Sequence, residues 1–192
     1  MFQELRASLG LLALSIIVMG IGYPLLVMGA GQALFPHQAS GSLVEKDGRI
    51  VGSALIGQNF ADDKYFHSRP SAAGSGYDAS NSSGSNLAPS SAALVKTVTE
   101  RVAELRKDGN TRPIPIDLVT ASGSGLDPDI SVASAEYQAA RIANVRNIPL
   151  AQIKSLIESN TTSRTFGVLG ENRVNVLAIN RALDLLPTPT AP

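Results

Sequence analysis

Residues 7–34 read ASLGLLALSIIVMGIGYPLLVMGAGQAL and contain no Asp, Glu, Lys, Arg or His. A helix of this length extends roughly 40 Å at ~1.5 Å per residue, whereas the hydrocarbon core of a bilayer is only ~30 Å thick. The stretch therefore predicts a single transmembrane helix over residues 7–34, with a short N-terminal segment, residues 1–6, before it. Everything after residue 34 must then lie on one side of a membrane.

The alternative is a cleaved signal peptide, whose apolar region is about 7–15 residues long and ends in small residues. Gly31 and Ala33 would supply such residues, but the apolar run is roughly twice too long, which favours a retained anchor. Arg6 flanks the start of the run, and no Lys or Arg follows it before Lys46. The positive-inside rule then predicts a cytoplasmic N-terminus and an extracytoplasmic main domain.

The composition of the chain restricts what the main domain does. Its roughly 155 residues suffice for one domain with its own core. The formal net charge of zero gives no indication of a nucleic-acid partner. The sequence has no cysteine, which excludes disulfides, thiolate metal sites and a catalytic thiol. The two histidines, His37 and His67, are far apart in the sequence and form no metal-ligand pattern.

The chain after the span predicts one α+β or α/β domain over residues 49–186. Residues 35–48 are expected to be a connector, polar and turn-like from Gly41 to Gly48, and residues 187–192 a flexible Pro-rich tail. Short strands are predicted at Arg49–Ile56, at an edge position over Ile114–Leu118, and at Val174–Ile179. Residues 180–186 fit either a continued strand or a helix.

Three helices are predicted, with Ser90, Ser131 and Pro149 at their N-termini. Gly109 is expected to end the first of these helices. Apolar residues recur in that helix at helical spacing, which predicts a face that packs in the core; they are Leu94, Val98, Val102 and Leu105.

Two features of the span point to its packing. Pro24 follows Gly20 and Gly22, and because proline lacks a backbone donor we expect a kink near Tyr23. Gly29 and Ala33 are four residues apart and share a helix face, where small residues permit close approach by a partner helix. The alternative is that glycine is simply common in membrane helices.

Residues 71–91 form the most unusual soluble stretch, rich in Ser, Gly and Asn, with Tyr77 and Leu87 as its only large apolar residues. Its composition is typical of a flexible loop or linker. Ordering about 20 residues costs on the order of 20–40 kcal/mol, and burying two side chains returns only about 5 kcal/mol. We therefore expect outside contacts to order it, from a partner subunit or a groove of its own domain. Arg69, in extended backbone before Pro70, would anchor its start through a bidentate contact to a carboxylate or backbone oxygens.

Several catalytic patterns are missing. Ser124 has Ser122, not glycine, two residues before it, so it is not in a Gly-x-Ser-x-Gly nucleophile elbow. The glycine loops around Gly74 and Gly123 lack the Lys of a phosphate-binding loop. Asp127 and Asp129 offer two carboxylates, fewer than the six or more oxygens that Ca²⁺ prefers, so a turn-stabilising role is favoured.

Several runs of the sequence, taken together and in order, resemble the C subunit of the bacterial Kdp potassium-transporting ATPase complex. The resemblance covers nearly the whole chain, and Thr120–Pro128 (TASGSGLDP) is its most specific run. The other matching runs are Tyr65–Ala72, Ser83–Leu87, Asp117–Val119, Tyr137–Gln138 with Arg141, and Arg173–Leu177. Tyr77, Asn86 and Leu87 lie where the resemblance is strong.

The resemblance implies a non-catalytic accessory subunit in a bacterial inner membrane. Its partners would be a channel-like potassium-binding subunit and a P-type ATPase subunit, which it joins. ATP and K⁺ would be handled by the complex, with no cofactor on this chain. The resemblance also implies a catalytic chaperone that raises the ATP affinity of the pump subunit, and for an extracytoplasmic domain that effect must be allosteric. The residues that we expect to contact partner subunits are Gly29, Ala33, Arg69, Tyr77, Asn86 and Leu87. A different class of function is the alternative: a stand-alone membrane-tethered periplasmic enzyme or binding module.

Overall fold

The computed structural model describes residues 2–107 and 109–187, and these fall into two compact units. The first unit ends at Ser53 and the second begins at Ala54. Residues 49–53, which the sequence led us to place in the main domain, group instead with the N-terminal unit. The expected flexible tail, residues 187–192, lies outside the described residues apart from Pro187.

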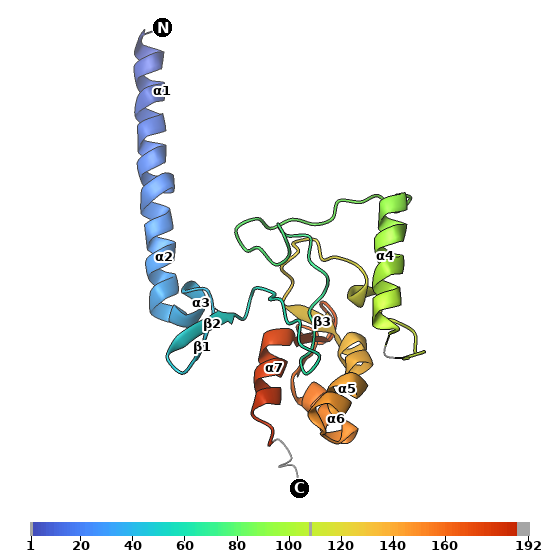
Figure 1. The fold of residues 1–192 in the computed structure, drawn as a ribbon. Coiled ribbons are helices and arrows are strands. Elements are labelled where there is room, and N and C mark those ends of the chain that lie inside the picture. Colours follow the sequence, from blue (N-terminus) through green and yellow to red (C-terminus); the bar gives the residue numbers. More distant parts are fainter. Residues whose placement is uncertain (1, 108, 188–192) are drawn as a thin grey trace. The chain divides into compact units, whose positions relative to one another are not determined.

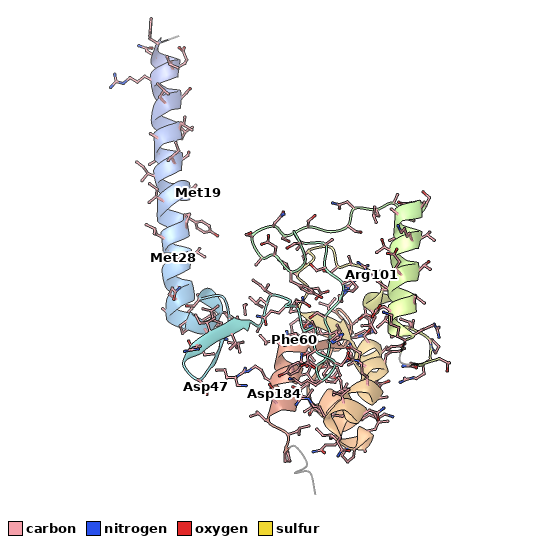
Figure 2. The ribbon with its side chains drawn as sticks, in the orientation of Figure 1. Met19, Met28, Asp47, Phe60, Arg101 and Asp184 are labelled. Carbon is pink, nitrogen blue, oxygen red and sulfur yellow. The ribbon has the colours of Figure 1, made fainter. Side chains whose placement is uncertain are left out.

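The first unit begins with a continuous helical rod from Phe2 to Leu34, long and apolar enough to cross a membrane (Figure 1). It consists of α1 (Phe2–Ser15), a π-helical stretch (Ile16–Gly22) and α2 (Tyr23–Leu34). Its large apolar side chains are exposed, as Figure 2 shows for Met19 and Met28. The unit therefore offers an apolar surface that its own chain does not cover.

The π-helical stretch explains how the helix continues through Pro24. Proline cannot donate a backbone hydrogen bond, and its ring crowds the preceding turn. The Tyr23 N–H bonds to the carbonyl of Val18, five residues back, which widens the helix just before the proline. We expected a kink near Tyr23; the structure has instead a π-helical segment just before it, within a helix that continues to Leu34.

A short helix and a hairpin complete the first unit, and they correct the prediction of a turn-like connector. After α3 (Pro36–Ala39), β1 (Leu43–Lys46) pairs antiparallel with β2 (Arg49–Ser53). The two-residue turn between them, Asp47 and Gly48, has φ of +53° and +72° (Asp47 is labelled in Figure 2). An Asp-Gly pair between two short runs is a strong hairpin signal, so the sequence did contain the evidence for β1.

The second unit is built on a small sheet with strand order β3-β5-β4, antiparallel throughout. The strands are β3 (Asp129–Ser131), β4 (Thr161–Thr162) and β5 (Arg173–Asn175). Three helices pack with it: α5 (Val132–Arg146), α6 (Leu150–Ser159) and α7 (Val176–Asp184). Because this sheet is antiparallel, the described part of the unit belongs to the α+β class and not to the α/β class, the two classes that the sequence had left open. Its core consists mainly of Phe66, Ile130, Ala135, Ala139, Ile142, Ile153, Ile157, Val174, Val176, Ile179 and Leu183.

Side-chain caps set where two of these helices begin. The Ser131 hydroxyl accepts a hydrogen bond from the Ser134 N–H, which confirms the predicted start of α5. The Asn175 side chain accepts from the Ala178 N–H and starts α7 immediately after β5. The predicted strand Val174–Ile179 is therefore wrong beyond residue 175, because an apolar run that fits a strand is overridden by the asparagine cap.

The helix predicted after Ser90 is present, but its start, its end and its burial were predicted wrongly, and so was the strand over residues 114–118. The helix α4 (Ala92–Leu105) begins after Ser91, not Ser90, ends before Gly109 is reached, and contains no buried residue. Its apolar stripe is only half-buried, so it does not belong to the core. The predicted edge strand over residues 114–118 contains a 3₁₀ turn, Ile116–Leu118, because its backbone N–H groups bond within the segment, from Leu118 to the Pro115 carbonyl. The Asp117 carboxylate also accepts hydrogen bonds from Ser131 and Ser134.

Residues 63–67, the strap, are held to α5 and α7 through their backbone. The Phe66 N–H donates to Asn180 Oδ1 at 2.8 Å, and Asn180 Nδ2 donates to the Phe66 carbonyl at 2.9 Å. Gln138 makes the same pair of bonds to His67: the His67 N–H donates to Gln138 Oε1 at 2.8 Å, and Gln138 Nε2 donates to the His67 carbonyl at 3.2 Å. Both amides are buried, and each satisfies two backbone groups that would otherwise lack partners.

Two arginines extend this arrangement to the rest of the strap. Arg141 donates to the carbonyls of Asp63 and Tyr65, and Arg146 donates to the Lys64 carbonyl at 2.8 Å. Arg146 also pairs with Asp184 at 2.8 Å, which ties α5 to α7. The side chains of two helices thus hold each residue of the strap, as a neighbouring strand would in a sheet.

Candidate functional site

Gly29 and Ala33, the predicted packing residues of the span, are both exposed on α2. A Cβ atom built on Gly29 would meet no atom within 4 Å. The unit that contains these residues therefore leaves room for a partner at this face. Whether a partner helix lies there stays a prediction.

Arg69 meets a carboxylate, as expected, although through one nitrogen. Its Nη1 lies 3.0 Å from Asp127 Oδ2, and both side chains are largely buried, with exposures of 26% and 31%. The other Asp127 oxygen accepts from the Asp129 N–H, and Asp129 pairs with Arg173 at 3.0 Å. The aspartates therefore hold a turn and two arginines, which agrees with the turn-stabilising role favoured by the sequence.

Tyr77 joins Arg69 in anchoring the start of the Ser-rich segment. Its hydroxyl donates to the Arg69 carbonyl at 2.7 Å, and its N–H donates to Ser71 Oγ at 2.8 Å. Burial raises the pKa of the Tyr77 hydroxyl further above physiological pH, where tyrosine is already a neutral donor. The segment therefore begins with a fixed turn in which Tyr77 has a φ of +56°.

The segment then docks on the loop that precedes β3. Ser71 Oγ donates to the Gly125 carbonyl at 2.6 Å, and the Ser83 N–H donates to the Ser124 carbonyl at 3.0 Å. Gly125 has a φ of +67°, and a Cβ atom there would lie 2.5 Å from the Ser83 carbonyl oxygen. Only glycine permits this approach of two backbones. We call this arrangement of residues 71–84 on residues 123–125 the interlock.

Asn86 and Leu87 lie beyond the interlock and do not share in it. Asn86 is exposed with a φ of +51°, and Leu87 is 37% exposed. Residues 71–91 therefore divide into a docked part and an exposed part. The docked part supports the version of our prediction in which the segment packs against its own domain.

An open cavity of about 980 Å³ lies between α4, α5 and residues 59–70. Phe60 and Arg101, labelled in Figure 2, are among its lining residues. His67 also lines it, and burial, followed by the nearby charge of Arg141, lowers the pKa of its imidazole. The His67 ring contacts the Asp62 carbonyl at 3.1 Å, and Arg101 donates to the Val119 carbonyl at 2.9 Å, so both side chains have structural contacts.

Residues 164–171 carried no expectation from the sequence. They form a turn whose apolar side chains are exposed, with Phe166 at 89%, Val168 at 73% and Leu169 at 60%. The run TFGVLG has neither helical nor alternating periodicity. The signal that would have found it is an uncharged run that contains two glycines and is flanked by the oppositely charged residues Arg164 and Glu171.

The chain is similar to known proteins along almost its whole length. The family model described as "KdpC: K+-transporting ATPase, c chain" matches residues 5–185. A protein named "Potassium-transporting ATPase KdpC subunit" from Acidobacterium capsulatum is 55% identical over 182 residues, which are 95% of this chain and 98% of that protein. Proteins of the same name are 56% identical over 188 residues in Gemmatimonas aurantiaca (97% and 94% of the two chains) and 52% identical over 189 residues in Methylococcus capsulatus (97% and 100%).

Proposed function

Because the chain belongs to the KdpC family and is a subunit of a potassium-transporting ATPase complex, we propose that it is a non-catalytic accessory subunit that assembles and stabilises the ion-conducting and ATP-hydrolysing subunits. The helix Phe2–Leu34 carries this proposal, because it has no charged residue from Ala7 onward and none of its most apolar window is buried by its own chain. Such a surface is stable in lipid or against other membrane helices.

The proposal predicts that the chain is recovered with the other pump subunits. Purification of the tagged chain from native membranes, followed by mass spectrometry, should yield a channel-like subunit and a P-type ATPase subunit. In the double variant Gly29→Leu and Ala33→Leu the helix should still insert, since both changes add apolar surface, but less complex should be recovered. The matched control is Leu12→Ile on the same rod. Recovery of the tagged chain alone, without pump subunits, would refute the accessory role.

We propose further that the N-terminus is cytoplasmic and the second unit extracytoplasmic. Arg6 and the absence of Lys or Arg between residues 35 and 45 support this orientation. A Ser40→Cys variant, at an exposed position after the rod, should react with a membrane-impermeant thiol reagent in intact cells. A Gln3→Cys variant should react only after the membrane is opened, and the reverse pattern would overturn the orientation.

In this orientation the chain acts on ATP only through its partners. The family resemblance implies that it raises the ATP affinity of the pump subunit, and an extracytoplasmic domain meets no cytoplasmic nucleotide. A photoreactive ATP analogue should therefore label the P-type subunit of the intact complex and leave this chain unlabelled. Labelling of this chain would instead place nucleotide directly on it.

We assign the exposed part of the Ser-rich segment, with Asn86 and Leu87, to partner contact, while Arg69 and Tyr77 hold its docked part in place. Backbone amides of Asn86 and Leu87 should exchange hydrogen fast in the isolated chain in detergent and more slowly in the complex. The Ser83 amide, bonded to Ser124, should exchange slowly in both states. Equal exchange rates of the Asn86 and Leu87 amides in the isolated chain and in the complex would refute partner contact at these residues.

A further inference from the structure

The turn at residues 164–171 exposes more apolar side chain than its size requires. Phe166, Val168 and Leu169 are 89%, 73% and 60% exposed and lie within four residues of each other. Single exposed apolar residues are normal on protein surfaces, but clustered ones mark interaction sites. We call residues 164–171 the apolar turn.

The base of the apolar turn is closed by contacts that do not involve its exposed apolar side chains. At its base, Arg164 Nη2 lies 2.5 Å from Glu171 Oε2, and Thr165 and Leu169 exchange both backbone hydrogen bonds, at 2.9 and 3.0 Å. Phe166 has a φ of +54°, a conformation that bulky side chains rarely adopt. A preformed turn loses little conformational entropy when it binds, which suits a docking anchor.

Beside the apolar turn lies a cleft of about 680 Å³ that extends the same surface. Gly170, in the turn, lines the cleft together with Ile116, which is 74% exposed. Four of the side chains that line the cleft are acidic and two are basic, and Arg164, just outside the cleft, pairs with one of the acidic groups, so that one net negative charge remains. The six residues are Asp117, Asp127, Asp129, Glu171, Arg69 and Arg173.

These charges decide between a lipid surface and a protein as the partner. Anionic lipid headgroups attract unpaired Lys and Arg. Residues 165–170 contain none of these, Arg164 is already paired with Glu171, and the neighbouring cleft is acidic. A protein pocket with an apolar floor and a basic rim complements both features.

We propose that the apolar turn is an anchor that inserts Phe166 into an apolar pocket, rimmed by Lys or Arg, on another subunit of the potassium pump. This inference rests on the proposed accessory function and adds to it the surface and the chemistry of the contact. Aromatic side chains that fill a pocket are among the anchors that contribute most to protein–protein affinity.

The test uses a substitution that removes the anchor without harming the fold. Phe166→Asn deletes the ring at a position where asparagine tolerates the positive φ better than phenylalanine does. Leu185→Asn is the matched control, because Leu185 is 85% exposed and lies away from the turn in sequence. The full-length chain is expressed with the other pump subunits, and its dissociation from the purified complex is measured on dilution in detergent.

We expect Phe166→Asn to weaken association about tenfold and Leu185→Asn to leave it unchanged. If the unmodified chain binds and Phe166→Asn binds equally well, the anchor is refuted while the accessory role stands. If the unmodified chain itself does not purify with the pump subunits, the accessory function fails first.

A photoreactive benzoylphenylalanine at position 166 identifies the partner directly. In the assembled complex it should crosslink to a polypeptide of the pump, in a fragment that contains apolar residues and Lys or Arg. The same group at position 185 should crosslink poorly. Crosslinking of position 166 to lipid alone, or in yield equal to that of position 185, would overturn the assignment to a protein pocket.

Discussion

The interlock and the apolar turn reverse the usual relation between composition and burial. The Ser- and Gly-rich residues 71–84 dock on their own domain through Tyr77 and a series of backbone contacts. Residues 164–171, which contain Phe166, Val168 and Leu169, stay exposed. Polarity therefore does not predict which of these loops is ordered by the domain itself.

The difference lies in what each loop offers for contact. Glycine at 84 and 125 lets two backbones approach within hydrogen-bonding distance, so the interlock needs almost no apolar side chains. The apolar turn is ordered by its own base and has no need of its exposed side chains for stability. Exposed apolar groups that do not stabilise the fold remain available for a partner.

The largest effect is expected from Gly125→Ala, which breaks the interlock. A Cβ atom there would lie 2.5 Å from the Ser83 carbonyl oxygen and 2.6 Å from the Ala73 nitrogen, at a φ of +67°. Backbone strain and overpacking together should lower the free energy of unfolding by about 3 kcal/mol. Pulse proteolysis of the full chain across a urea series in detergent measures the change.

Gly123→Ala is the control for this prediction. It lies two residues earlier in the same loop, and a Cβ atom there would meet nothing within 4 Å. Its unfolding midpoint should stay within about 0.5 kcal/mol of the unmodified chain. Equal losses in the two variants would show that the close approach of residues 83 and 125 does not order the segment.

A smaller loss is expected from Tyr77→Phe, which removes one hydrogen bond from the start of the interlock. The hydroxyl is half-buried and donates to the Arg69 carbonyl at 2.7 Å. Loss of this bond should lower the free energy of unfolding by about 1 kcal/mol. Tyr65→Phe removes a more exposed bond to Asp184, 3.1 Å long, and should change the same urea midpoint by less. A larger loss of stability in Tyr65→Phe than in Tyr77→Phe would show that the interlock is not where the stabilising contact lies.

The smallest effect on stability is expected from Phe166→Asn in the apolar turn. The ring is 89% exposed, and asparagine adopts the positive φ more readily, so the unfolding midpoint should stay the same or rise slightly. A loss of more than about 1 kcal/mol would mean that the ring packs within the domain. The interlock and the apolar turn would then no longer differ in the way described.

Local signals predicted the elements that depend on local chemistry. The uncharged run predicted the rod, and Ser131 and Pro149 marked the starts of α5 and α6. The strand predicted over Val174–Ile179 was wrong because its apolar run fits a strand by composition, whereas Asn175 caps a helix that begins at Val176. The hairpin β1–β2 was missed although Asp47-Gly48 stood in the sequence.

The candidate site was less predictable because its contacts join distant parts of the chain. An acidic or backbone partner for Arg69 was expected, but no spacing rule identifies Asp127, which follows 58 residues later. The need for glycine at 125 appears only when residues 71–84 lie against it. The exposure of Phe166 depends on the rest of the domain leaving it uncovered, which no local pattern records.

The strap has a consequence for how this chain tolerates substitution. Asn180, Gln138 and the two arginines of α5 bind main-chain atoms of residues 63–67, and every residue supplies those atoms whatever its side chain. Exposed strap positions such as Lys64 are therefore free to vary, provided that proline does not replace a donor. Asn180 has no such freedom, since its side-chain amide presents an acceptor oxygen and a donor NH2 group side by side, as the Phe66 N–H and carbonyl require. For these hydrogen bonds, selection should therefore preserve the side chains of α5 and α7 that make them, and not the exposed side chains of the strap.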